Sequence, residues 1–146
     1  MSSVKRVALV AHDNKKKALV DWVVKNKERL EMCELITTGT TGKLIADAVG
    51  LSVTKVLSGP LGGDQQIGAR ISEQTVDLLV FFWDPLEPMS HDPDIKALLR
   101  IATLWNIPVA CNQSSADFII SSPLMDQYKR DVPNFDGYTQ RTIRID

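Results

Sequence analysis

The stretch VALVAHD, residues 7–13, determines the fold class of this chain. Its first five residues are all apolar, and two polar residues, His12 and Asp13, follow them directly. A strand that is apolar at consecutive positions, rather than at every second one, is typical of a parallel sheet covered on both faces. The stretch therefore predicts a buried strand whose carboxyl end carries His12 and Asp13.

Similar apolar runs predict the other strands of the sheet, at residues 33–36, 54–57, 78–82 and 108–110. Segments with apolar residues at helical spacing are found at residues 14–29, 43–49, 65–73, 92–102 and 116–120. Strands that alternate with helices predict an α/β domain of three layers, α/β/α, in which a five-stranded parallel sheet lies between helices.

The composition is that of one globular domain. The chain has 146 residues, of which 44% are hydrophobic and 24% are charged, and its formal net charge is −1. This length suits a single domain, residues 1–146, and the charge argues against general binding to nucleic acid or to a membrane surface. No signal region is evident, and no apolar run approaches the roughly 20 residues that span a bilayer. We therefore expect one soluble cytoplasmic domain.

The sequence gives no sign of a metal site. Its two cysteines, Cys33 and Cys111, lie in apolar surroundings and form no CxxC or Cys/His cluster. The scattered histidines and aspartates also lack the spacing of zinc ligands. We expect two buried thiols in a reducing compartment.

Residues capable of chemistry follow the first four predicted strands. These segments are His12-Asp13, residues 37–42 (TTGTTG), residues 58–64 (SGPLGGD) and residues 83–91 (WDPLEPMSH). Because ligands bind outside the carboxyl ends of the strands in such sheets, the four segments should meet at one edge. This shared position predicts a binding or active site there.

The TTGTTG segment precedes a predicted helix and has two possible roles. Its threonine hydroxyls, its free backbone N–H groups and the helix N-terminus would suit a phosphate. A helix capped by threonine, with glycines in the turn, is the alternative, although six such residues exceed what a cap needs. Nearby, one of Lys15, Lys16 and Lys17 is placed to reach a bound phosphate, and the spacing does not say which one.

Asp64 and His91 are the candidates for proton transfer. An aspartate entering a helix is often an N-cap, and a histidine in a loop is often merely exposed. Together, however, a carboxylate base and an imidazole donor supply what proton abstraction next to a carbonyl requires. His12 and Asp13 end the first predicted strand and Asp84 ends the fourth, and any of these carboxylates could orient an imidazole or take part directly. The residues alone thus favour proton abstraction from a small phosphorylated carbonyl compound.

Five motifs together resemble methylglyoxal synthase: VALVAHD, TTGTTGKLI, LSGPLGGDQQIGA, FFWDPL and HDPDIKALLRIA. The similarity covers about residues 4–121, and SGPLGGDQQ is highly specific. The resemblance implies a carbon–oxygen lyase that converts dihydroxyacetone phosphate to methylglyoxal and inorganic phosphate, with phosphate also acting as inhibitor. It further implies no metal or organic cofactor, a cytoplasmic homohexamer and the strand order 3-2-1-4-5.

The resemblance also implies roles for individual residues. Asp64 would remove a proton from the hydroxymethyl carbon, and His91 would polarise the carbonyl and move a proton between the enediolate oxygens. Substrate and phosphate contacts would come from His12, Lys16, Thr38, Gly39, Thr40, Thr41, Ser58 and Gly59. Supporting roles near the site would fall to Asp13, Asp84 and Asp94.

The C-terminal segment, residues 126–146, fits the family pattern poorly. The family often places a C-terminal arginine near a phosphate site or a subunit contact, and Arg141 and Arg144 both remain candidates. We expect this segment to pack at subunit contacts. The alternative function is a non-catalytic phosphate-ligand regulatory domain, like the effector-binding domains of carbamoyl phosphate synthetase. A flavodoxin-like or phosphoacceptor domain fits the glycine-rich Asp64 loop less well.

Overall fold

A computed structural model describes residues 4–87 and 92–144. The strands are β1 (Arg6–Ala11), β2 (Glu34–Thr38), β3 (Val53–Val56), β4 (Leu78–Phe82) and β5 (Val109–Ala110). The helices are α1 (Lys16–Lys25), α2 (Lys27–Leu30), α3 (Gly39–Val49), α4 (Gly63–Ser72), α5 (Asp92–Leu104), α6 (Gln113–Ile120), α7 (Leu124–Gln127) and α8 (Asp136–Thr139). Two 3₁₀ turns, η1 (Asp13–Lys15) and η2 (Gly59–Leu61), follow β1 and β3. None of these helices has the length and apolar character needed to cross a membrane.

The strands form one parallel sheet in the order β3-β2-β1-β4-β5, which confirms the order expected from the resemblance. In the sheet register, Ala11 at the end of β1 pairs with Phe82 at the end of β4, and Thr38 at the end of β2 pairs with Val56 at the end of β3. The carboxyl ends of these strands are therefore level with one another. The chain moves outward from β1 in both directions, which places a switch point between β1 and β4.

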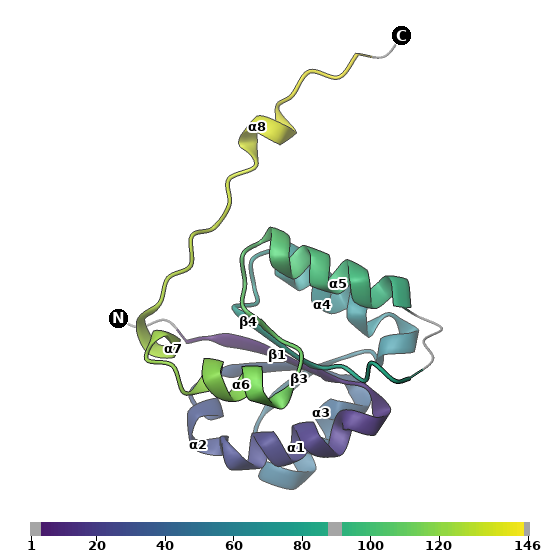
Figure 1. Cartoon of the computed structure of the whole chain (residues 1–146), viewed down its shortest axis with the longest axis vertical. Helices are drawn as coiled ribbons and strands as arrows, with labels where there is room; N and C mark the ends of the chain where they lie inside the picture. Colours follow the sequence, from purple (N-terminus) through teal and green to yellow (C-terminus); the bar gives the residue numbers. More distant parts are fainter. Residues whose placement is uncertain (1–3, 88–91, 145–146) are drawn as a thin grey trace.

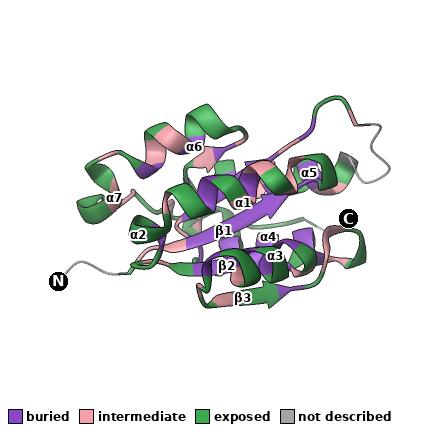
Figure 2. Cartoon of the chain, turned by 90° about the horizontal axis from the view of Figure 1, so that it is seen from below, coloured by how far each residue is buried: buried purple, intermediate pink, exposed green. Residues whose placement is uncertain are grey.

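Helices cover both faces of the sheet, as the sequence predicted (Figure 1). Helices α4 and α5 lie together on one face, and α1, α2, α3 and α6 lie on the other. Figure 2 shows that β1, in the middle of the sheet, is largely buried, whereas the edge strand β3 is partly exposed. The fold thus has the expected three layers.

Three helices begin before their predicted starts, and one of them, α6, begins at Gln113 rather than at residue 116. Helix α3 begins at Gly39 rather than Lys43, so the last four residues of TTGTTG are helical. A side chain at Gly42 would overlap the hydroxyl of Thr37, so this glycine serves close packing of the helix on β2. Helix α4 similarly begins at Gly63, before the predicted start at residue 65.

The helix predicted at residues 14–29 is divided into three parts. A 3₁₀ turn precedes α1, and α1 ends at Lys25. Asn26 is the C-cap residue of α1, and its side chain donates a hydrogen bond of 2.8 Å to the carbonyl of Trp22 in the last turn. The backbone of Asn26, with φ −110° and ψ 22°, is not helical, so it separates α1 from the short helix α2.

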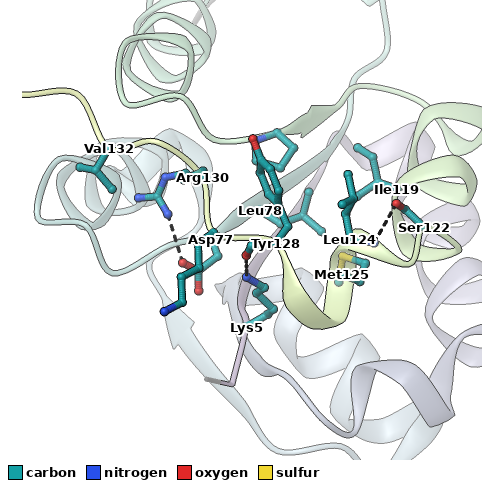
Figure 3. A pocket seen from close by; sticks show the side chains of 12 residues that line it. Lys5, Asp77, Leu78, Ile119, Ser122, Leu124, Met125, Tyr128, Arg130 and Val132 are labelled. Atoms are coloured by element: carbon teal, nitrogen blue, oxygen red, sulfur yellow. Dashed lines mark hydrogen bonds and ion pairs between the residues drawn. The ribbon is translucent and has the colours of Figure 1, made fainter. Parts of the chain in front are cut away.

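After α7 the chain extends away from the body of the domain, with α8 in the extended part (Figure 1). The start of this segment is held at the amino ends of the strands. There Lys5 Nζ donates to the carbonyl of Tyr128 at 2.7 Å, and Arg130 contacts Asp77 at 3.3 Å (Figure 3). Further along, Phe135 packs edge-on against Trp105, with ring centroids 5.1 Å apart.

A cavity of about 550 Å³ lies beside this anchor, at the amino ends of β1 and β4 (Figure 3). Most of its lining is apolar, including Leu78, Ile119 and Met125. Burial acts to raise the pKa of Asp77, but hydrogen bonds from Arg6 and the nearby charge of Arg130 outweigh it and lower that pKa. Asp77 thus joins Arg130 on the cavity wall to Arg6 beside it.

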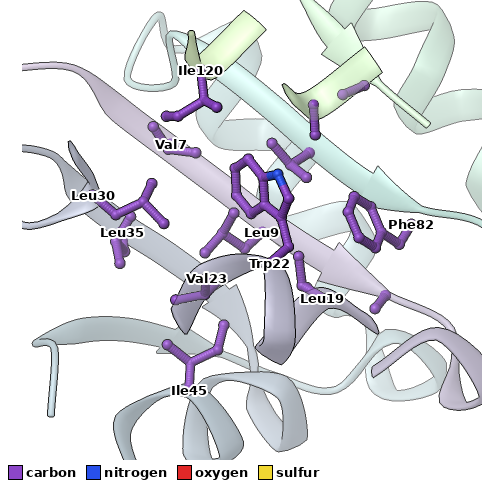
Figure 4. Close-up of a cluster of buried hydrophobic side chains, with 14 of the residues drawn as sticks. Val7, Leu9, Leu19, Trp22, Val23, Leu30, Leu35, Ile45, Phe82 and Ile120 are labelled. Carbon is purple, nitrogen blue, oxygen red and sulfur yellow. The ribbon is translucent and has the colours of Figure 1, made fainter. Parts of the chain in front are cut away.

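Two hydrophobic clusters hold the strands in place. On the α1 side, Leu9, Trp22 and Phe82 pack in one cluster (Figure 4). On the α4 and α5 side, Val10 and Phe81 belong to the other. Since β1 and β4 contribute to both clusters, the residues that follow these strands start from a rigid base.

Candidate active site

A second pocket, of about 220 Å³, lies at the carboxyl ends of the strands. The structure brings eight of the predicted site residues onto its wall: His12, Asp13, Lys16, Thr38, Thr40, Ser58, Gly59 and Asp64. Gly39, Thr41, Asp84 and Asp94 do not line it. His91 lies outside the described residues.

Asp64 reaches the pocket because of the glycines before it. Gly62 has φ +108°, a left-handed conformation that favours glycine, and serves as the N-cap of α4. A side chain at Gly63 would overlap the carbonyl oxygen of Leu57, so the helix can begin directly against the end of β3 only with glycine there. Asp64 follows in the first helical turn with 4% exposure. The alternative role of Asp64 as N-cap is therefore wrong, since Gly62 holds that position.

The surroundings of Asp64 suit a buried carboxylate that faces a ligand. A Cβ atom at Gly59 would lie 3.4 and 3.5 Å from the two carboxylate oxygens, so the Gly59 backbone packs directly on this group. The N-terminus of α4 carries partial positive charge, which stabilises the negative charge of Asp64. The glycine keeps the pocket side of the carboxylate open to a substrate.

The N-terminus of α3 forms another wall of the pocket. Thr38 is its N-cap residue, yet its side chain makes no capping hydrogen bond. The threonine-cap alternative is therefore wrong for this hydroxyl, and the first backbone N–H groups of α3 lack partners within the helix. Thr38 and Thr40 both line the pocket. Such a helix end attracts anions, and phosphate in particular.

Thr41 and Gly39 stand behind this wall. Thr41 is fully buried, and its hydroxyl has no hydrogen-bond partner in the part of the chain that the structure describes. A Cβ atom at Gly39 would lie 3.4 Å from the carbonyl oxygen of Val56, so Gly39 lets α3 approach β3 closely. Both residues therefore help to place the helix N-terminus without lining the pocket.

Of the three neighbouring lysines, Lys16 is the one that lines the pocket. Its side chain is 20% exposed and its ammonium group pairs with Asp13, whereas Lys17 is 89% exposed and pairs with Asp21. The hydrogen bond and the charge of Lys16 lower the pKa of Asp13. Lys16 thus provides a positive charge beside the helix end.

His12 is held by the chain that follows β4. Its Nδ1 atom accepts a hydrogen bond of 2.9 Å from the backbone N–H of Asp84, and its ring packs edge-on against Phe81. Asp84 thus holds this imidazole through its backbone. Its carboxylate accepts hydrogen bonds from Asn14 Nδ2 at 3.1 Å and from the N–H of Leu86 at 3.0 Å. These two bonds, that of Asn14 foremost, lower the pKa of Asp84.

Asp94 lies outside the pocket wall but contacts a neighbour of Asp64. It accepts a hydrogen bond of 2.8 Å from Gln65 Nε2 and so joins α5 to the first turn of α4, next to Asp64. Two other residues, Asn14 and Glu87, were not predicted from the sequence. Glu87 lines the pocket, with Oε2 3.9 Å from Nδ1 of His12. The available sequence signal for Glu87 was its place three residues after Asp84, in the segment that follows β4.

Known proteins are similar to this chain along nearly its whole length. Residues 18–111 match the family model of the MGS-like domain. A methylglyoxal synthase from Saccharophagus degradans is 58% identical over 99% of this chain and 96% of its own length. One from Hahella chejuensis is 61% identical over 96% of this chain and 92% of its own. The chain belongs to the methylglyoxal synthase family.

Solved structures agree with this assignment. A crystal structure of methylglyoxal synthase from Elizabethkingia anophelis NUHP1 matches with a TM-score of 0.89 and 51% identity, over 97% of this chain and 93% of that one. The resemblance seen in the motifs is thereby confirmed. Methylglyoxal synthases are lyases, and the pocket at the carboxyl ends of β1 to β4 is the candidate active site of this member of the family.

Proposed function

We propose that this chain converts dihydroxyacetone phosphate to methylglyoxal and inorganic phosphate. The observation that carries the proposal is the buried Asp64 carboxylate, which shares one small pocket with the N-terminus of α3 and with Lys16. A base beside an anion site is what proton abstraction from a phosphorylated carbonyl compound requires. Membership in the methylglyoxal synthase family supports the same reaction.

The phosphate of the substrate would bind first among backbone donors. The N–H groups at the start of α3, the hydroxyls of Thr38 and Thr40, and the Ser58-Gly59 segment surround the same pocket. Lys16 would add a charge-assisted hydrogen bond, because its ammonium group lies on this wall beside Asp13. Inorganic phosphate would bind to the same groups, as product and as inhibitor.

Asp64 would then remove a proton from the hydroxymethyl carbon, which gives an enediolate. Hydrogen bonds from His12 and His91 would stabilise the negative oxygen. We assign His91 the role of polarising the carbonyl and moving a proton between the oxygens, on the family pattern alone. An Asn substitution of His91 should lower the rate strongly without affecting folding, and unchanged kinetics would remove this role.

The second half of the reaction is loss of phosphate. The C–O bond to phosphate breaks with its electron pair on the departing phosphate, and an enol remains. The carbon that carried the phosphate takes up a proton to become the methyl group of methylglyoxal. For this elimination the C–O bond must stand out of the enediolate plane, so the anion site has to hold that torsion angle.

The remaining expectations concern assembly and surroundings. We propose a cytoplasmic homohexamer that uses no metal or organic cofactor, with residues 126–146 at subunit contacts. Within the described chain the extended segment supports this, because Tyr138 and Ile143 are 64% and 65% exposed. The Arg141 guanidinium stacks on the ring of Tyr138 and donates to the Tyr138 carbonyl, so contacts with α8 occupy this side chain. Arg144 is exposed and so is the better candidate for a phosphate or subunit contact.

The experiment is an assay of methylglyoxal and free phosphate from dihydroxyacetone phosphate, in the presence of a chelator. Equal amounts of both products would support the reaction. Binding of phosphate without either product, at micromolar enzyme, would contradict it and would favour the regulatory-domain alternative.

A further inference from the structure

Asn14 joins two segments that are 70 residues apart in the sequence. It lies in the turn η1 after β1, and its Nδ2 atom donates a hydrogen bond of 3.1 Å to Oδ2 of Asp84, which follows β4. Strands β1 and β4 are neighbours at the switch point of the sheet. Asn14 does not line the pocket, and its side chain is linked to the site through Asp84.

Both oxygens of the Asp84 carboxylate are engaged. Oδ2 accepts from Asn14, and Oδ1 accepts from the N–H of Leu86 at 3.0 Å. The residue is 8% exposed, so water competes little for these bonds. With its side chain fixed on two sides, the backbone of Asp84 keeps one orientation, in which its N–H donates to Nδ1 of His12 at 2.9 Å.

This last bond determines the proton position on His12. A nitrogen that accepts a hydrogen bond has no proton, so Nδ1 is unprotonated and a neutral imidazole carries its proton on Nε2. Several charged groups surround the ring and act on its protonation. Those that line the pocket with it, or flank it, are Asp13, Lys16, Asp64, Asp84 and Glu87.

The carboxylates among these groups favour a second proton on His12, and Oε2 of Glu87 lies 3.9 Å from Nδ1. The N–H of Asp84 opposes them, because Nδ1 cannot both hold a proton and accept that bond. A neutral imidazole can still donate a hydrogen bond to an oxygen. Because the ring carries no positive charge, it does not add to the attraction that would hold inorganic phosphate in the pocket. The orientation of Asp84 is therefore what separates a neutral His12 from a charged one.

We propose that Asn14 is a positioning residue, which fixes the Asp84 carboxylate so that the Asp84 N–H keeps His12 neutral with its proton on Nε2. In this state His12 donates a hydrogen bond to an oxygen of the phosphorylated substrate. The link to turnover rests on the proposed function, whereas the state of the ring does not.

The kinetic test compares Asn14→Ala with Asn26→Ala. Asn26 also donates a side-chain hydrogen bond, to the carbonyl of Trp22, but at the far end of α1 from the pocket. We expect Asn14→Ala to lower kcat/KM about tenfold, as the loss of a hydrogen bond to a charged group predicts. Asn14→Asp should lose more, because two carboxylates would then face each other, and Asn26→Ala should change kcat/KM little.

The pH profile separates positioning from a general loss of stability. Without Asn14 the pKa of Asp84 rises, so the carboxylate is lost at a higher pH on acidification, and the acid limb of kcat/KM should move upward. The proposal would be overturned if Asn14→Ala had the same kcat/KM as Asn26→Ala and its acid limb stayed at the pH of the parent.

Nitrogen NMR tests the ring directly and needs no turnover. The chain has two histidines, so the His91→Asn variant leaves His12 as the source of all imidazole signals. We expect an unprotonated Nδ1 and a protonated Nε2 at neutral pH, because the N–H of Asp84 donates to Nδ1. Adding Asn14→Ala should mix the two tautomers.

A proton on Nδ1 in the parent, or identical spectra with and without Asn14, would refute the role of Asn14 even if methylglyoxal is formed. Conversely, the expected spectra in a protein that forms no methylglyoxal would support the positioning role and contradict only the proposed reaction.

Discussion

The two ends of the sheet carry cavities of very different character. The cavity at the amino ends is the larger, about 550 Å³ against about 220 Å³, and most of its wall is apolar. On its wall Asp77 pairs with Arg130, and Asp77 also pairs with Arg6 beside the cavity. At the carboxyl ends, by contrast, the buried polar residues His12 and Asp64 line the smaller void together with the start of a helix. The chemistry of the lining, rather than the volume, distinguishes the candidate active site from the larger cavity.

The largest expected effect is on activity at the carboxyl end. Asp64→Asn removes the proposed base while it keeps the shape of the side chain, so turnover should fall by about a thousandfold or more. Phosphate binding should remain, since the donors of α3 are unchanged. A coupled assay of methylglyoxal, with calorimetry of phosphate binding as control, measures both. Near-normal release of methylglyoxal would end the assignment of Asp64 as base.

Gly63→Ala should show that the same end also depends on close packing. The added methyl group would overlap the carbonyl oxygen of Leu57, and backbone cannot move aside cheaply. We expect a loss of about 3 kcal/mol in the free energy of unfolding, at the upper end of the cost of overpacking. Urea denaturation followed by circular dichroism gives this value. A stability equal to that of the parent would mean that β3 and α4 are less tightly joined than the structure indicates.

Asp77→Asn is the matching test at the amino end, where we expect lost stability and unchanged kcat. Removal of the charge that Arg6 and Arg130 share should cost about 2 kcal/mol at pH 7. Because the folded-state pKa of Asp77 is lowered, its stabilisation is present above its ordinary value of 3.8 and is lost as the pH falls through the lower folded-state value. The difference between parent and variant in urea titrations should therefore shrink in acid. A large loss of kcat in this variant would show that the two ends are coupled.

The smallest effect is expected at Gly68, in the middle of α4, where an added Cβ meets no atom within 4 Å. Gly68→Ala should raise the free energy of unfolding by about 0.5–1 kcal/mol, since alanine is the better helix former. Thermal unfolding beside Gly63→Ala makes the pair a matched comparison within one helix. A loss of stability in Gly68→Ala would contradict the open space described there.

The strands were predictable because their signal is local. Consecutive apolar residues at 7–11 and 78–82 identify buried strands without knowledge of any partner. The start of α3 was not predictable in this way, because glycine and threonine are poor helix formers and the reason for Gly42 is its contact with Thr37. The short helices α7 and α8, of four residues each, lack a periodic signal altogether.

The site shows the same division. The order of strands and loops was enough to place Asp64 and His12 at one edge. The role of Asn14 depends on a contact with Asp84 across 70 residues, and no spacing along the chain reports such a contact. Sequence reasoning therefore finds residues that point into a site more readily than those that hold them.

The two edges of the sheet have a consequence for aggregation. At one edge, β3 has four residues and exposes Thr54 and Lys55. At the other, β5 has two residues. A short edge with a lysine side chain, or one of two residues, offers a poor template for strand addition by another molecule. Copies of this chain should therefore associate through helices and the C-terminal segment, and concentrated solutions should resist growth into cross-β fibres.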